Sequence, residues 1–134
     1  MPEKATIQRA KADLRAGKRP STAAGEFVRE EIEHIREGKH GARSPEQAIA
    51  IGLSKARRAG VPLKPPKKGQ AKKSTRQSAE RDYGVGQGRR KRRASSSKRS
   101  TAMRKRLKRE PKSSVSRAAL SRHAKSVARR RKRA

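Results

Sequence analysis

The chain has 134 residues and a formal net charge of +30, with 39% charged, 29% hydrophobic and 1% aromatic residues. So little apolar material excludes one large hydrophobic domain over the whole length, because burial does not offset the conformational entropy of so charged a chain. The excess of positive charge indicates a polyanionic partner. The absence of cysteine excludes disulfides and thiolate metal sites. No apolar run approaches the ~20 residues of a membrane span.

The opening segment MPEKATIQRA has no continuous apolar stretch, so we expect no secretory signal. Charge then divides the chain into two parts. Residues 1–66 hold 14 Lys and Arg against 8 Asp and Glu, whereas residues 67–134 hold 27 against 3. Most large aliphatic residues lie in the first part, which is therefore the part expected to fold.

Two helices are predicted before residue 40. The first runs from about Glu3 to Ala16 and ends at Gly17, and the second begins after Ser21 and ends at Gly38. Apolar residues at helical spacing define one face of each helix: Ile7, Ala10 and Leu14 in the first, and Ala24, Val28, Ile32 and Ile35 in the second. The second helix presents Arg29, Glu30, Glu33 and Arg36 outward, and its acidic character argues against contact with a phosphate backbone.

A third helix is predicted from the stretch SPEQAIAIGLSKARRAGVP, residues 44–62. Ser44 is its N-cap, Pro45 occupies the first turn, and Gln47 completes a capping box. Gly60 supplies the left-handed position that follows the helix, and Val61 folds back as its hydrophobic contact.

The spacing of Ala48 and Gly52 also resembles the turn of a helix-turn-helix motif. A recognition helix would then begin near Ser54 and need about eight more residues, but Gly60 and Pro62 end it too early. One unbroken helix is the better interpretation, with Gly52 allowing the close approach of another helix.

Prolines and glycine between Leu63 and Gly69 mark the end of this predicted head. Residues 67–100 lack hydrophobic periodicity and are expected to be a disordered basic linker, and residues 101–134 a basic tail. Two short helical patterns, Thr101–Arg109 and Ser114 to about Arg131, are expected to fold on binding. The predicted fold is all-α: a small three-helix head at residues 1–66 followed by a largely disordered basic tail with short nascent helices.

Three dense basic clusters are the strongest functional signal, and they predict nucleic-acid binding through phosphates with little sequence preference. They are Arg89, Arg90, Lys91, Arg92 and Arg93; Arg104, Lys105, Arg106, Lys108 and Arg109; and Arg129, Arg130, Arg131, Lys132 and Arg133. Secondary contacts are predicted at Lys55, Arg57, Arg58 and Tyr83. A solubilising tail is the alternative interpretation.

Other candidate sites are weak. Residues 83–88, YGVGQG, are interpreted as a flexible hinge with a tyrosine for base stacking, because no strand precedes these glycines. His34 and His40 lie six residues apart with no third ligand arranged nearby, so no metal site is predicted. No nucleophile, base and orienting group fall within reach of one another, so neither a catalytic residue nor a cofactor is expected.

The stretches STAAGEFVREEIEHIREGKHGARSPEQAIAIGLSKARRAGVPLKPPKKG and RQSAERDYGVGQG resemble a family of small basic bacterial proteins of unknown function, often labelled DNA-binding. The resemblance covers about residues 1–88, and the basic end is similar in composition to bacterial histone-H1-like tails. It implies a bacterial source and a cytoplasmic or nucleoid location, and it brings no catalytic residue.

The sequence thus favours a non-enzymatic, nucleoid-associated DNA-binding protein. Two alternatives stay open: an RNA- or ribosome-associated basic protein, and an interaction protein whose helical head binds a protein partner or self-associates while the tail anchors it to a polyanion.

Overall fold

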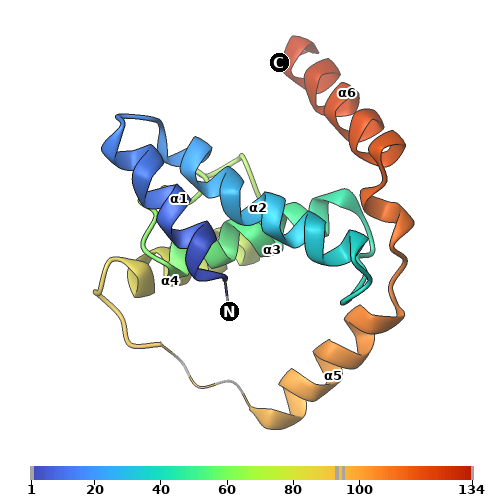
Figure 1. Ribbon diagram of the computed structural model, residues 1–134. Helices are drawn as coiled ribbons and strands as arrows, with labels where there is room; N and C mark the ends of the chain where they lie inside the picture. The colour runs from blue at the N-terminus through green and yellow to red at the C-terminus, as the bar shows by residue number, and fades with distance from the viewer. Residues whose placement is uncertain (1, 93, 95, 134) are drawn as a thin grey trace. The chain divides into compact units, whose positions relative to one another are not determined.

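The computed structural model describes residues 2–92, 94 and 96–133, and within them the chain forms six α-helices and one short 3-10 helix (Figure 1). None of the described helices is long and apolar enough to cross a bilayer. The elements are α1 (Lys4–Arg15), α2 (Pro20–Arg36), α3 (Pro45–Arg58), α4 (Lys73–Gly86), α5 (Ser97–Arg109), η1 (Ser113–Val115) and α6 (Arg117–Arg133).

The helices belong to two compact units, and two of them run from one unit into the other. Unit 1 consists of Met1–Glu30 and Ala50–Ala94, and unit 2 of Glu31–Ile49 and Ser95–Ala134. Unit 1 therefore holds α1, α4 and parts of α2 and α3. Unit 2 holds the end of α2, the start of α3, and α5, η1 and α6.

Small residues dominate the core of unit 1. Phe27 is its largest fully buried side chain, and alanines from α1, α2 and α3 surround it. Small side chains let the helices approach closely, which compensates for the scarcity of large apolar residues. The buried members are Ala10, Ala23, Ala24, Phe27, Ala56 and Val61, with Ile7, Leu14, Leu53 and Leu63 packed against them.

The predicted caps of α3 at Ser44 and Gly60 are confirmed, whereas Gln47 bonds to the N–H of Arg43 rather than to that of Ser44, as a capping box requires. The Ser44 hydroxyl accepts a hydrogen bond from the Gln47 N–H at 3.2 Å, and the Gln47 side chain accepts one from the Arg43 N–H at 2.6 Å. At the other end, Gly60 has a φ of +103° and Val61 donates its N–H to the Ala56 carbonyl at 3.1 Å, which forms a Schellman motif. The helix is unbroken, as predicted.

Gly52 allows close helix packing, which is also confirmed. A Cβ atom at this position would lie 2.6 Å from the Cα atom of Val28, so only glycine lets α3 approach α2 at this point. Gly86 has the same role in α4, because a Cβ atom there would collide with the carbonyl oxygen of Arg57.

The predicted three-helix head followed by a disordered tail is wrong. Residues 73–86 form α4, which belongs to unit 1, where Ala79 and Gly84 are buried. The glycines of residues 83–88 are therefore the last turn and C-terminal end of a helix rather than a flexible hinge, and Gly88 at φ +75° ends it. The sequence pattern missed α4 because it packs through alanine and glycine, which produce no hydrophobic periodicity.

The basic tail is folded as well. α5 begins at Ser97, earlier than predicted, because the Ser96 hydroxyl accepts a hydrogen bond from the Arg99 N–H at 3.2 Å. Val115, in η1, is fully buried in the core of unit 2. The other members of that core come from α2, α3 and the loop between them: Ile35, Ala42 and Ala48, with Ile32 packed against them.

Of the four α2 residues predicted to face outward, Arg29, Glu33 and Arg36 are exposed, whereas Glu30 is buried. Glu30 is 3% exposed and accepts a hydrogen bond from the Glu3 N–H at 2.6 Å in unit 1. In unit 2, Arg36 bonds to a carbonyl oxygen of the tail. Ile35 is fully buried in the same unit, so this part of the apolar stripe of α2 is used for the core rather than for self-association.

Candidate nucleic-acid interface

The candidate interface lies in unit 2, on α5 and α6. α5 carries seven Lys and Arg residues among 13, and α6 carries eight among 17. Neither helix contains Asp or Glu, and every one of these fifteen cationic residues is exposed. The predicted clusters Arg104–Arg109 and Arg129–Arg133 are therefore accessible positions on two helices of the same unit.

Backbone hydrogen bonds join the end of α5 to the loop between α2 and α3. Gly41 donates its N–H to the carbonyl of Leu107 at 2.8 Å, and Ala42 donates its N–H to the carbonyl of Pro111 at 3.1 Å. Gly41 packs so closely here that a Cβ atom would collide with the backbone of Glu110. The C-terminal end of α5 and the segment that leads to α6 are thus held by hydrogen bonds to the α2–α3 loop.

The first turns of α6 are fixed in the same unit. Ser116 caps the helix, since its hydroxyl accepts a hydrogen bond from the Ala119 N–H at 3.2 Å. The ring of His123 lies 3.1 Å from a carboxylate oxygen of Glu46, at the start of α3. Beyond Val127, every described residue of α6 is exposed, so Arg129–Arg133 form a solvated cationic end.

The spacing of charge along these helices resembles that of a nucleic-acid strand. At about 1.5 Å rise per residue, α5 is about 20 Å long and α6 about 26 Å, which gives one cation per ~3 Å of helix axis. A DNA strand carries one phosphate per about 3.4 Å of its axis. The two helices are therefore matched in charge density to a phosphate backbone.

Little of this charge is neutralised within the protein. Arg106 is exposed and lies 3.8 Å from the half-buried Glu110, one turn further along the chain. Within the described part of the chain, no other Lys or Arg of α5 or α6 lies within ion-pair distance of a carboxylate. Like charges one turn apart, such as Arg104 and Lys108, destabilise a helix slightly, and a bound polyanion would relieve that repulsion.

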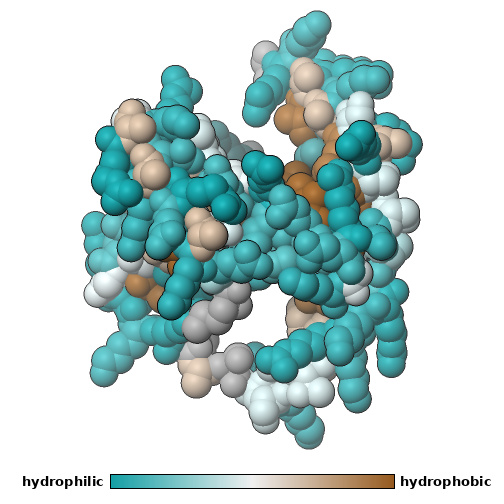
Figure 2. Space-filling view, viewed as in Figure 1, coloured by the Kyte–Doolittle hydropathy of each residue, from teal (hydrophilic) through white to brown (hydrophobic). Residues whose placement is uncertain are grey.

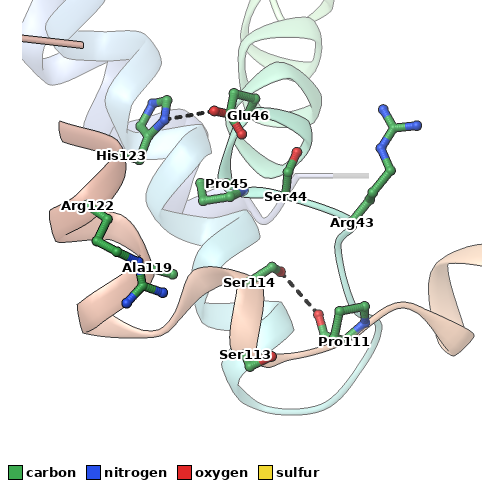
Figure 3. A pocket seen from close by; sticks show the side chains of 10 residues that line it. All are labelled: Arg43, Ser44, Pro45, Glu46, Pro111, Ser113, Ser114, Ala119, Arg122 and His123. Atoms are coloured by element: carbon green, nitrogen blue, oxygen red, sulfur yellow. Dashed lines mark hydrogen bonds and ion pairs between the residues drawn. The ribbon is translucent and has the colours of Figure 1, made fainter. Parts of the chain in front are cut away.

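An open depression in unit 2 lies beside the start of α6 (Figure 3). The Glu46 carboxylate and the His123 ring point toward one another across it, and Arg43 and Arg122 lie on opposite sides. The backbone N–H of Glu46, in the first turn of α3, is the main cause that lowers the pKa of this carboxyl group, and His123 lowers it further. The depression thus places a carboxylate beside the cationic surface, and His123 is its partner.

The first predicted cluster lies in the other unit. Arg89, Arg90, Lys91 and Arg92 follow α4 in unit 1 and are exposed, whereas Arg93 lies outside the described residues. The Arg90 side chain packs on Gly84 of α4: its Cγ and Cδ atoms lie 3.3 Å from the position that a Cβ atom of residue 84 would take. This contact holds the start of the first cluster against α4.

The predicted secondary contacts are less accessible. Arg57 is 8% exposed, and its guanidinium donates hydrogen bonds to the carbonyls of Leu63 and Lys64 at 3.2 and 3.4 Å. Burial lowers its pKa, while Asp82 acts in the opposite direction. Arg58 pairs with Asp82 at 3.4 Å, and Lys55 and Tyr83 are half-buried. Arg57 therefore stabilises the chain after α3, and we exclude it from the interface.

Hydrophilic residues cover most of the surface visible in Figure 2, with only small apolar patches. No protein-family model matches the chain, and neither the curated proteins nor the solved structures provide a match. The candidate interface therefore rests on the residues of this chain alone.

Proposed function

We propose that this protein is a non-enzymatic DNA-binding protein that contacts phosphates through α5 and α6 with little sequence preference. The observation that supports the proposal is the set of fifteen exposed cations on two helices that contain no acidic residue. In keeping with the sequence resemblance, we propose that it acts in the bacterial cytoplasm on the nucleoid.

Helical structure of the tail favours duplex DNA over duplex RNA. The major groove of B-DNA, about 12 Å wide, admits an α-helix, whereas the deep and narrow major groove of A-form RNA does not. Preformed helices such as α5 and α6 therefore suit DNA, and their charge spacing suits its backbone.

Composition of the two helices supports low sequence specificity. Neither α5 nor α6 contains Asn or Gln, the side chains that read adenine through paired hydrogen bonds. Their arginines are consecutive or clustered, and side chains that point in all directions around a helix contact phosphates more readily than base edges.

Fluorescence anisotropy with the full-length protein tests this proposal. Two duplexes of unrelated sequence and one RNA hairpin of equal charge are titrated at 50 and 200 mM salt. We expect equal affinities for the two duplexes, weaker binding to the hairpin, and a fall of at least about 10³-fold for each duplex between the two salt concentrations. Tighter binding to the hairpin would favour the RNA alternative, and salt-insensitive or sequence-selective binding would overturn the proposal.

A further inference from the structure

Three side chains with metal-ligating atoms meet in unit 2, on the last turns of α2 and in the loop after it. Glu31 and His34 lie one turn apart on α2, and His40 follows that helix. One carboxylate oxygen and one ring nitrogen of each histidine all lie within 4.8 Å of one another. Glu31 is only 1% exposed, so its carboxylate is an interior group of the unit.

The end of α2 explains how His40 reaches this place. Gly38, at φ +83°, ends the helix, and Lys39 donates its N–H to the carbonyl of His34 at 3.0 Å. This Schellman motif reverses the chain direction and carries His40 back over the last turn of α2. As a result, the Nε2 atom of His40 lies 3.3 Å from a carboxylate oxygen of Glu31.

The contact made by Nδ1, the second ring nitrogen of His40, determines how the ring is oriented toward the Glu31 carboxylate. Nδ1 lies 3.0 Å from the carbonyl oxygen of Gly41. A carbonyl oxygen only accepts hydrogen bonds, so Nδ1 carries the hydrogen in this contact. Nε2 is then the ring nitrogen that faces the Glu31 carboxylate, and it is the atom of His40 that can ligate an ion. Metal-ligating histidines commonly donate their second ring N–H to a backbone carbonyl in this way.

We propose that Glu31, His34 and His40 bind a divalent zinc-type ion with one open position for water. Zinc bonds of about 2.0–2.1 Å in a tetrahedral arrangement place neighbouring ligand atoms about 3.3–3.4 Å apart. The 3.3 Å contact between His40 and Glu31 already has this length. Two histidines and one carboxylate are an established ligand set for zinc, and the chain has no cysteine to compete for the ion.

Metal binding would stabilise the segment after His40, which is hydrogen-bonded to the tail. Gly41 and Ala42 directly follow His40, and their N–H groups bond to the carbonyls of Leu107 and Pro111. An ion that fixes His40 therefore stabilises these two hydrogen bonds and the attachment of α5. The proposed site links α2 to the tail, and it does not depend on the proposed DNA binding.

Metal titrations of the full-length protein test the site, with zinc and cobalt(II) as the probes. We expect one ion per chain and the visible absorption of four-coordinate cobalt. His34→Ala and His40→Ala should weaken binding by about 100-fold or more, since loss of an outer-shell partner alone costs 10–100-fold. His123→Ala, which removes the third histidine of the chain, is the matched control and should bind as the wild type does.

Amide hydrogen exchange of the wild-type protein gives a second test that needs no variant. Zinc should slow exchange at Gly41 and Ala42. Absence of binding at micromolar zinc, or equal affinities of the His34, His40 and His123 variants, would overturn the site. Stoichiometric binding that leaves the exchange of these two amides unchanged would overturn its link to the tail.

Discussion

Arg36 donates hydrogen bonds from Nε and Nη2 to the backbone carbonyl of Val115, each at 3.3 Å. The two residues are 79 positions apart in the chain, one in α2 and the other in η1. Val115 is also fully buried beside Ile35 in the same unit. Through this contact the tail, which is mostly Lys, Arg and Ser, packs into the core of unit 2. Its cationic side chains then lie exposed on α5 and α6.

Truncation of Val115 should therefore destabilise unit 2. Val115→Ala removes two buried methyl groups and leaves a cavity, which costs about 2 kcal/mol. We expect faster amide exchange at Gly41 and Ala42 and a lower free energy of unfolding in urea. Met103→Ala is the matched control, because Met103 lies in the same tail but is 52% exposed, and it should change stability by less than about 0.5 kcal/mol. Equal effects of the two variants would contradict the buried role of Val115.

Two glycines in helices should respond in opposite directions to substitution by alanine. Gly52→Ala places a Cβ atom 2.6 Å from the Cα atom of Val28, and the forced separation of α2 and α3 in unit 1 should cost about 1–3 kcal/mol. Gly25→Ala is the control, because Gly25 lies in α2 with no atom within 4 Å of the new Cβ. It should stabilise the protein by about 0.5–1 kcal/mol, since alanine is the better helix former. Thermal unfolding measures both, and destabilisation by Gly25→Ala would contradict the packing described.

The lowered pKa of Glu46 predicts a pH dependence. A carboxyl group whose pKa is lower in the folded state stabilises the fold above its unfolded-state pKa, and this contribution is lost as the pH falls through the folded-state value. Stability of the wild type should therefore converge with that of Glu46→Gln in acid. Carbon-detected NMR titration should show Glu46 releasing its proton at lower pH than a glutamate in an unstructured peptide does.

His123→Ala separates the two causes of this lowered pKa. The largest cause is the hydrogen bond from the Glu46 backbone N–H, and His123 adds to it. The variant should therefore raise the titration midpoint of Glu46 only part of the way to that of an exposed glutamate. A complete return to the exposed value would show that the helix terminus contributes nothing.

Local signals in the sequence predicted α1 and α3 well, and α2 except for its start, which is at Pro20 rather than after Ser21. Ser44 and Gly60 fix the ends of α3 through contacts within a few residues of themselves, so their roles can be read without a structure. The all-α class was likewise expected, although α4 and the folded tail were not. Capping signals depend on residues close together in the chain and not on a hydrophobic core. They can therefore be recognised even in a sequence with so few apolar residues.

Long-range contacts account for what the sequence did not predict. α4 packs through Ala79 and Gly84, which carry no periodic hydrophobic signal. Burial of Val115 depends on a pocket formed by α2 and the loop after it, and one isolated valine gives no indication of that partner. Glu31 was not predicted to join His34 and His40, although Glu31 and His34 have the one-turn spacing that puts two side chains on one helix face.

The salt dependence of duplex binding by two charge-matched variants tests the central claim most directly. Arg129→Gln/Arg130→Gln/Arg131→Gln removes three exposed cations from α6, and Lys4→Gln/Lys11→Gln/Arg15→Gln removes three exposed cations from α1. If the helices of the tail contact phosphates, the slope of log affinity against log salt concentration should become shallower by about 2.5–3 in the α6 variant and stay within about 0.5 of wild type in the α1 variant. Equal changes in the two slopes would contradict the account, because binding would then follow net charge rather than the cationic surface of α6.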